Sequence, residues 1–142
     1  MNIIIEGTDG CGKTTTIEAL KTMFPKANFS DRNHDTICKY MLKDVDMKTR
    51  IDAYQAFLKA NDVKVVFLIN NDGEELLRRI KTRNKPISDF DLEAPLYNTL
   101  YRDTYVIMKV NNMTEGKLFM VDVTGLSLSE QIDKVKKTIE TF

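Results

Sequence analysis

The sequence lacks the charge imbalance that marks many proteins that bind nucleic acid or membranes. It carries no net charge, because 21 Lys and Arg residues balance 21 Asp and Glu residues. A global electrostatic attraction to either kind of surface is therefore not expected, although local charged patches can still form. We expect no stable nucleic-acid or membrane partner.

The sequence is also poor in histidine and cysteine and has no long apolar run. His34 is the single histidine, and no second His or Cys stands at ligand spacing from it, which disfavours a zinc-type site. Cys11 and Cys38 form no CxxC pair, which fits a reducing compartment, so the cytoplasm is the expected location. The longest apolar runs, Ile3–Ile5 and Val65–Ile69, fall far short of the roughly 20 residues that span a bilayer.

The 142 residues instead show strand patterns alternating with helix patterns, over a length that suits one domain with one core. The predicted strands are Asn2–Glu6, Ala27–Asp31, Val63–Ile69 and Lys117–Val123. The predicted helices are Lys13–Met23, Asp35–Lys43, Asp46–Lys59, Glu74–Thr82, Glu93–Val110 and a last helix that Ser127 opens. Asp72 is predicted to cap the helix Glu74–Thr82, Glu130 completes a capping box with Ser127, and Asn84–Asp91 is predicted as a polar loop. This order predicts an α/β fold in a single domain over residues 1–142, with a mostly parallel sheet of about four strands and helices on both faces.

Two helices carry apolar stripes that predict which side faces the sheet. In the helix over residues 93–110 the expected inner side holds Leu96, Leu100 and Ile107, and Tyr97, Tyr101 and Tyr105 are expected to pack along the helix. In the last helix the expected inner stripe is Leu128, Ile132, Val135 and Ile139.

Residues 7–14, Gly-Thr-Asp-Gly-Cys-Gly-Lys-Thr, match the phosphate-binding pattern GxxxxGK[ST] completely, between a predicted strand and a predicted helix. The glycines let the loop curl so that its N–H groups point at phosphate oxygens, and the helix N-terminus adds positive charge. Lys13 is predicted to reach the β- and γ-phosphates, and the Thr14 hydroxyl to ligate Mg²⁺. The motif predicts ATP and Mg²⁺ as cofactors, held by Thr8, Asp9, Gly10, Cys11, Gly12, Lys13, Thr14 and Thr15.

The start of the chain resembles that of thymidylate kinases, which are P-loop kinases of deoxynucleoside monophosphates. Residues 3–15 fit the family pattern of apolar residues, then Glu-Gly-x-Asp-Gly, then x-Gly-Lys-Thr-Thr. Phe29–Asn33 resembles the family strand that ends in Asp-Arg-Tyr, and Leu76–Arg83 resembles the arginine-bearing helix that enters the lid. The resemblance covers most of the chain and is strong in the first 16 residues. It implies ATP-dependent transfer of a phosphoryl group to dTMP or another dNMP.

The sequence departs from the family after the first helix. There the family has a long segment that selects thymine, whereas here Phe24–Ser30 fills the whole interval, so the acceptor base stays open. A second alignment, in which Ser30–Asn33 replaces the family's Arg-Glu-Pro-Gly turn, is also open. Relatives are commonly dimers through helices that this chain partly lacks, and a homodimer is one expectation.

The resemblance implies roles for residues around the loop. Arg32 would clamp the acceptor phosphate, and Asp9 would meet the 3′-hydroxyl of the acceptor sugar. Asp31 would bind Mg²⁺ from a strand beside the loop, with helix capping as its alternative. Glu6 stands where related deoxynucleoside kinases have a general base; a monophosphate acceptor needs none, so a structural role is equally open.

The remaining candidates lie in a predicted lid around residues 78–91 and in the following helices. Five of the eight residues 78–85 are basic, and Arg79 and Arg83, one helical turn apart, are predicted to act on the transferring phosphoryl group; a solvated basic face is the alternative. The candidates for holding the acceptor base are Tyr40, Arg50, Tyr54 and Phe57.

Two other functions compete with the nucleotide kinase. One is a kinase acting on a nucleoside or on a polynucleotide 5′ end. The other is an ATP-binding switch or simple ATPase without acceptor kinase activity, because the shortened segment falls on the acceptor pocket.

Overall fold

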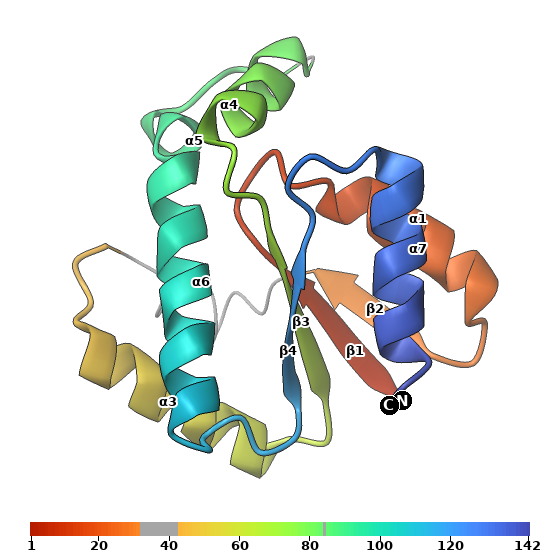
Figure 1. Ribbon diagram of the computed structural model, residues 1–142, viewed down its shortest axis with the longest axis vertical. Helices are drawn as coiled ribbons and strands as arrows, with labels where there is room; N and C mark the ends of the chain where they lie inside the picture. The colour runs from red at the N-terminus through yellow and green to blue at the C-terminus, as the bar shows by residue number, and fades with distance from the viewer. Residues whose placement is uncertain (32–42, 84) are drawn as a thin grey trace.

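The computed structural model describes residues 1–31, 43–83 and 85–142. Within these ranges four strands form one parallel sheet, in the order β2-β1-β3-β4 (Figure 1). The strands are β1 (Asn2–Glu6), β2 (Asn28–Asp31), β3 (Lys64–Ile69) and β4 (Leu118–Asp122). The predicted α/β fold with a parallel sheet is confirmed.

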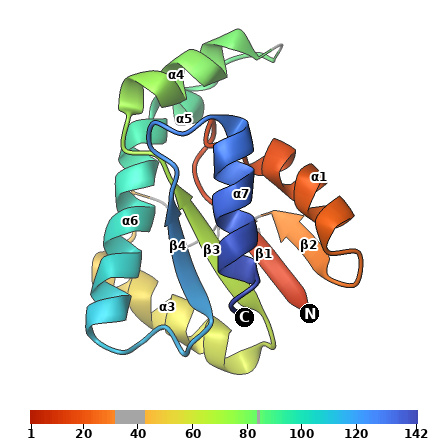
Figure 2. The same cartoon turned by 45° about the vertical axis from the view of Figure 1, so that its right-hand side comes forward.

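Helices cover both faces of this sheet. Figures 1 and 2 show α1 and α7 on one face and α3 and α6 on the other, with α4 and α5 beyond the end of the sheet that β3 leads into. The helices are α1 (Lys13–Met23), α3 (Met47–Ala60), α4 (Gly73–Thr82), α5 (Asp89–Leu92), α6 (Ala94–Val110) and α7 (Leu128–Ile139). No helix in the described part of the chain is long and apolar enough to cross a membrane.

The strands are apolar on both faces because each face meets a helix layer. Ile4 and Phe67 belong to the core cluster under α3 and α6, whereas Ile5 and Val66 belong to the cluster under α1 and α7. Successive side chains of a strand point to opposite faces, so a nearly continuous run of Ile, Val, Leu and Phe is what a sheet buried on both sides requires.

Side-chain caps begin two helices as the sequence predicts. The Asp72 carboxylate accepts a hydrogen bond from the Glu75 N–H at 3.1 Å and starts α4. Ser127 and Glu130 form the predicted capping box, in which each side chain bonds the other's backbone N–H, at the start of α7. These caps fix where both helices begin, beside the carboxyl ends of β3 and β4.

The predicted inner faces of α6 and α7 need correction. The buried side of α6 holds Tyr97, Tyr101 and Met108, while Leu96 and Ile107 are exposed. Aromatic rings meet above β3, where Tyr101 packs edge-on against Phe67 at 5.0 Å between ring centroids. The predicted packing role of Tyr97 and Tyr101 is thus confirmed.

In α7 the buried positions are Gln131, Val135 and Ile139, and Leu128 is exposed at the start of the helix. The buried stripe of α7 therefore begins with a polar residue, Gln131.

Two further expectations differ from what the structure describes. The polar loop predicted over residues 84–91 contains the start of the short helix α5, which the reciprocal bonds between Ser88 and Asp91 begin. The helix predicted over Asp35–Lys43 falls, except for its last residue, outside the described residues.

Replacing Leu68 in β3 by Ala should lower the free energy of unfolding by about 2–5 kcal/mol, because its side chain is 0% exposed and its loss leaves a cavity. Leu96→Ala on α6, where the side chain is 42% exposed, should change this free energy by no more than about 0.5 kcal/mol. Urea denaturation followed by circular dichroism measures both. Equal losses would contradict the assignment of the inner face of α6.

Candidate functional site

The loop between β1 and α1 is curled at two glycines. Gly10 and Gly12 both have φ near +83°, a conformation that residues with a Cβ rarely adopt. A Cβ on Gly10 would also lie 2.8 Å from the carbonyl oxygen of Leu76, and one on Gly12 would lie 2.7 Å from Nε2 of Gln131. Glycine is required at both positions because α4 and α7 close directly onto the loop.

Lys13 folds back over this loop. Its ammonium donates to the carbonyl oxygens of Gly7 at 2.7 Å and Thr8 at 3.0 Å, and the residue is only 9% exposed. The positive charge thus sits at the centre of the loop, compensated by backbone dipoles, where an anionic ligand would meet it.

Gln131 ties α7 to the loop, and the sequence analysis missed it. Its Nε2 donates to the Cys11 carbonyl oxygen at 2.8 Å and to the Thr16 hydroxyl at 3.0 Å, and the side chain is fully buried. One signal was available, since position 131 stands on the same helical stripe as Val135 and Ile139. A polar residue on a buried stripe indicates a specific hydrogen-bond partner.

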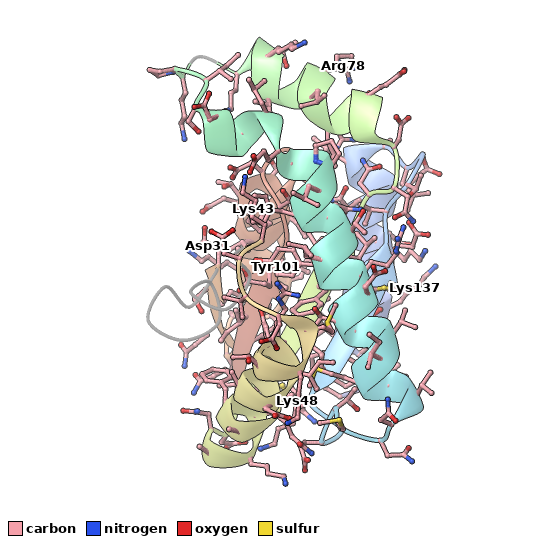
Figure 3. All side chains as sticks on the ribbon, turned by 90° about the vertical axis from the view of Figure 1, so that its left-hand side faces the viewer. Asp31, Lys43, Lys48, Arg78, Tyr101 and Lys137 are labelled. Carbon is pink, nitrogen blue, oxygen red and sulfur yellow. The ribbon has the colours of Figure 1, made fainter. Side chains whose placement is uncertain are left out.

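A cleft of about 890 Å³ opens above the loop. The loop side and the end of β2 form one wall, and α4 with the residues after it forms the other; Figure 3 shows Arg78 on α4 and Asp31 at the end of β2. The loop before α7 completes the lining. The lining residues are Asp9, Gly10, Gly12, Lys13, Thr14, Thr15, Asp31, Glu75, Arg78, Arg79, Thr82, Arg83, Lys85, Leu126, Ser127 and Leu128.

Carboxylates hold the arginines of the α4 wall. Glu75 bonds Arg78 at 2.6 Å and Arg79 at 2.9 Å, and these two hydrogen bonds lower the pKa of Glu75 to about 2. Arg79 also reaches across to the Gly10 carbonyl oxygen at 3.4 Å. Arg83 pairs with Asp91 at 2.6 Å. The arginines therefore stand at the cleft already paired with carboxylates, with Arg78 and Arg79 sharing Glu75. An incoming phosphate would meet the N–H groups that these pairs leave available.

Thr14 and Asp31 supply the oxygen donors of the predicted Mg²⁺ site. Asp31 ends β2 in register with Ile5 of β1, so the structure confirms its predicted place beside the loop, and both donors line the cleft. Within residues 1–31, 43–83 and 85–142 no group of three or more His, Cys, Asp or Glu residues gathers as a metal site. A hydroxyl and a carboxylate fit Mg²⁺, which takes few protein ligands and completes its shell with phosphate oxygens and water.

Several predicted site residues lie beneath the cleft or away from it. Glu6 is fully buried and accepts a hydrogen bond from the Tyr101 hydroxyl at 2.5 Å, as Tyr101 reaches from α6 toward the sheet (Figure 3). Thr8 and Cys11 are buried inside the loop. The structure brings none of these three side chains to the cleft lining.

Three of the residues predicted to hold the acceptor base or phosphate lie in the described part of the chain, and two do not. The three are buried in α3: Arg50, Tyr54 and Phe57. Arg50 donates to the Val45 carbonyl oxygen at 2.7 Å, and the two aromatic side chains belong to the core under α3 and α6. None of the three lines the cleft. Arg32 and Tyr40 lie outside the described residues.

Comparison with known proteins shows the fold. No family model matches the sequence, and no curated protein matches it. The deoxyadenosine kinase from M. mycoides with bound dATP is similar, with a TM-score of 0.59 and 18% identity, over 99% of this chain and 100% of that chain. The same kinase with bound dCTP gives 0.56 and 18% over the full length of both chains, and its complex with the products dCMP and a flexible dCDP gives 0.51 and 16% over 99% of each. The chain thus has the fold of a P-loop deoxynucleoside kinase, while nothing in these matches points to thymidylate kinases specifically.

Replacing Gln131 by Leu should lower the free energy of unfolding by about 1–3 kcal/mol, because the buried Cys11 carbonyl and Thr16 hydroxyl lose their shared donor. It should also weaken binding of Mg·ADP, since the loop loses its tie to α7. Ile132→Leu, on the half-buried neighbouring position, is the matched control and should change neither quantity. Calorimetric titration with Mg·ADP and urea denaturation test both effects; unaltered ADP affinity in Gln131→Leu would contradict the positioning role of Gln131.

Proposed function

We propose that this protein is an ATP-dependent kinase that transfers the γ-phosphoryl group to a nucleoside monophosphate. The leading candidates for this acceptor are dTMP and the other dNMPs. One observation carries the proposal. The phosphate loop with Lys13, and the α4 wall with Arg79 and Arg83, face each other across a single cleft. Phosphoryl transfer needs positioning and neutralisation of charge more than covalent chemistry from the protein, and this arrangement places cations on both sides of the phosphates.

Each part of the cleft takes a distinct portion of the donor. The loop N–H groups and Lys13 hold the β- and γ-phosphates, while Thr14 and Asp31 hold Mg²⁺, which neutralises the phosphate oxygens when bound. Leu126 and Leu128, which line the cleft at the loop before α7, would hold the adenine. Arg79 and Arg83 contact the transferring group through the N–H groups that do not bond Glu75 or Asp91.

The position of Glu6 favours a monophosphate as the acceptor. Transfer to a sugar hydroxyl requires a base to take the proton, whereas a monophosphate is already an anion. Glu6 is buried against Tyr101 and does not line the cleft, which supports a structural role. Asp9 does line the cleft, which supports the proposed contact of its carboxylate with the acceptor sugar.

A deoxynucleoside acceptor is the second candidate. Three solved structures similar to this chain over nearly its whole length are of a deoxyadenosine kinase, one of them with dCMP as a bound product. The same cleft and donor chemistry serve both acceptors, so the choice depends on the acceptor pocket.

A coupled ADP-release assay with Mg·ATP separates these candidates. The panel holds dTMP, the other dNMPs, the four deoxynucleosides and a 5′-hydroxyl oligonucleotide. Stimulation by a monophosphate supports the first proposal, and stimulation by a deoxynucleoside supports the second. ATP binding with no stimulation by any acceptor would point to the switch or ATPase.

Lys13→Ala should lower kcat by at least about 10²-fold, because the group that neutralises the transferring phosphates is lost. The matched control is Lys48→Ala on α3, whose side chain is 87% exposed and pairs with Asp52 away from the cleft, as Figure 3 shows for Lys48. Circular dichroism should show both variants folded. If Lys13→Ala turns over as the wild type does, the loop is not the donor site.

Arg32→Ala should raise the KM of the acceptor or lower kcat while ATP affinity is retained, because Arg32 is proposed to clamp the acceptor phosphate. Acceptor titrations at saturating ATP, together with calorimetric titration of a non-hydrolysable ATP analogue, measure the two effects. Loss of analogue binding would mean that Arg32 acts on the donor instead.

A further inference from the structure

Asp91 lies in the lid, in contact with the phosphate loop, and the proposed function gives it no role so far. Its side chain is only 7% exposed although it ends a polar stretch of the chain. One carboxylate oxygen bonds Nη2 of Arg83 at 2.6 Å, and the other accepts the Ser88 N–H at 2.9 Å. The side chain of Asp9, from the phosphate loop, contacts the same carboxylate.

These contacts keep Asp91 ionised despite its burial. A buried carboxylate is costly unless hydrogen bonds and an opposite charge compensate it. The Ser88 N–H first, and the Arg83 guanidinium next, lower the pKa of Asp91 against the opposing effect of burial. Asp91 is thus a fixed negative charge at the edge of the cleft.

Among the described residues, Asp91 is the one group that bonds the guanidinium of Arg83. Its Nη2 is engaged by Asp91, whereas its buried Nε has no hydrogen-bond partner among the described residues. The residue lines the same cleft as Lys13. An arginine carries five donors in a rigid fork, so a guanidinium held through one nitrogen still has N–H groups for a phosphate.

We propose that Asp91 is a positioning residue that holds Arg83 at the cleft, with its guanidinium placed for the γ-phosphate of the donor before the nucleotide binds. Without this carboxylate the long arginine side chain must be ordered at the moment of binding, and that conformational entropy is then lost from the affinity.

This inference rests on the proposed function only in taking the γ-phosphate as the target of Arg83. Binding of a non-hydrolysable donor tests it without any acceptor. The acceptor-stimulated assay of the wild type tests the kinase activity separately, so each can fail without the other.

The experiment titrates Mg·AMPPNP and Mg·ADP into the wild type, Asp91→Asn, Arg83→Ala and the double variant by calorimetry. Asparagine can still accept the Ser88 N–H but lacks the charge that holds Arg83. We expect Asp91→Asn to weaken AMPPNP binding about tenfold, the size of a charge-assisted hydrogen bond. ADP affinity should stay within about twofold, and in the Arg83→Ala background Asp91→Asn should cause no further loss beyond that margin.

Ser88→Ala serves as the structural control. It removes the hydroxyl that accepts the Asp91 N–H at the start of α5 and leaves the ion pair intact. It should lower Tm and keep AMPPNP affinity within about twofold of the wild type.

Three results would overturn the proposal. Asp91→Asn could leave AMPPNP binding unaltered. It could instead tighten AMPPNP binding, and this would mean that the carboxylate withholds Arg83 from the donor. It could also weaken AMPPNP and ADP equally, and to the same extent with and without Arg83, which is what a purely structural role predicts.

Discussion

The close approach of α4 and α7 to the loop between β1 and α1 is the constraint on which the rest of the site depends. Leu76 of α4 and Gln131 of α7 lie so near Gly10 and Gly12 that no Cβ fits at either position. This approach holds the loop curled, keeps Lys13 folded onto the carbonyls of Gly7 and Thr8, and brings the arginines of α4 within reach of the loop. The sheet supplies the frame, because β1 is buried between β2 and β3 and delivers the loop at a fixed position.

Charge is balanced across the cleft by local pairs. Lys13 is compensated by backbone carbonyls, Arg79 by Glu75 and Arg83 by Asp91. Each cation is thus stable without a ligand and retains N–H groups for a phosphate. A site built this way leaves none of these three cations unpaired in the empty cleft, where an unpaired charge would be costly, and binds phosphates through the N–H groups that these pairs leave available.

The sequence predicted the parts of this molecule that depend on local pattern. The strand and helix order, the caps at Asp72 and Ser127, and the position of Asp31 beside the loop all follow from periodicity or from a short motif, and the structure confirms them. The loop itself was recognisable because its spacing and glycines are set by phosphate geometry.

What the sequence did not predict depends on contacts between distant segments. The inner face of α6 is set by how Tyr101 fits against Phe67 and Glu6, which a leucine stripe does not reveal. Gln131 meets Cys11 across 120 positions of sequence, and its polarity alone does not name its partner. Asp91 falls in a stretch whose pattern indicates a loop, because α5 is too short to show a helical period.

Transfer of label from [γ-³²P]ATP is the direct test of the proposed kinase activity, since it separates a kinase from an ATPase in one measurement. The protein is incubated with Mg²⁺, labelled ATP and a mixture of dNMPs and deoxynucleosides, and the products are resolved by chromatography. For a kinase, the label should appear in a nucleotide product formed from the acceptor. Label found in inorganic phosphate alone, or remaining entirely in ATP, would contradict the proposed kinase activity.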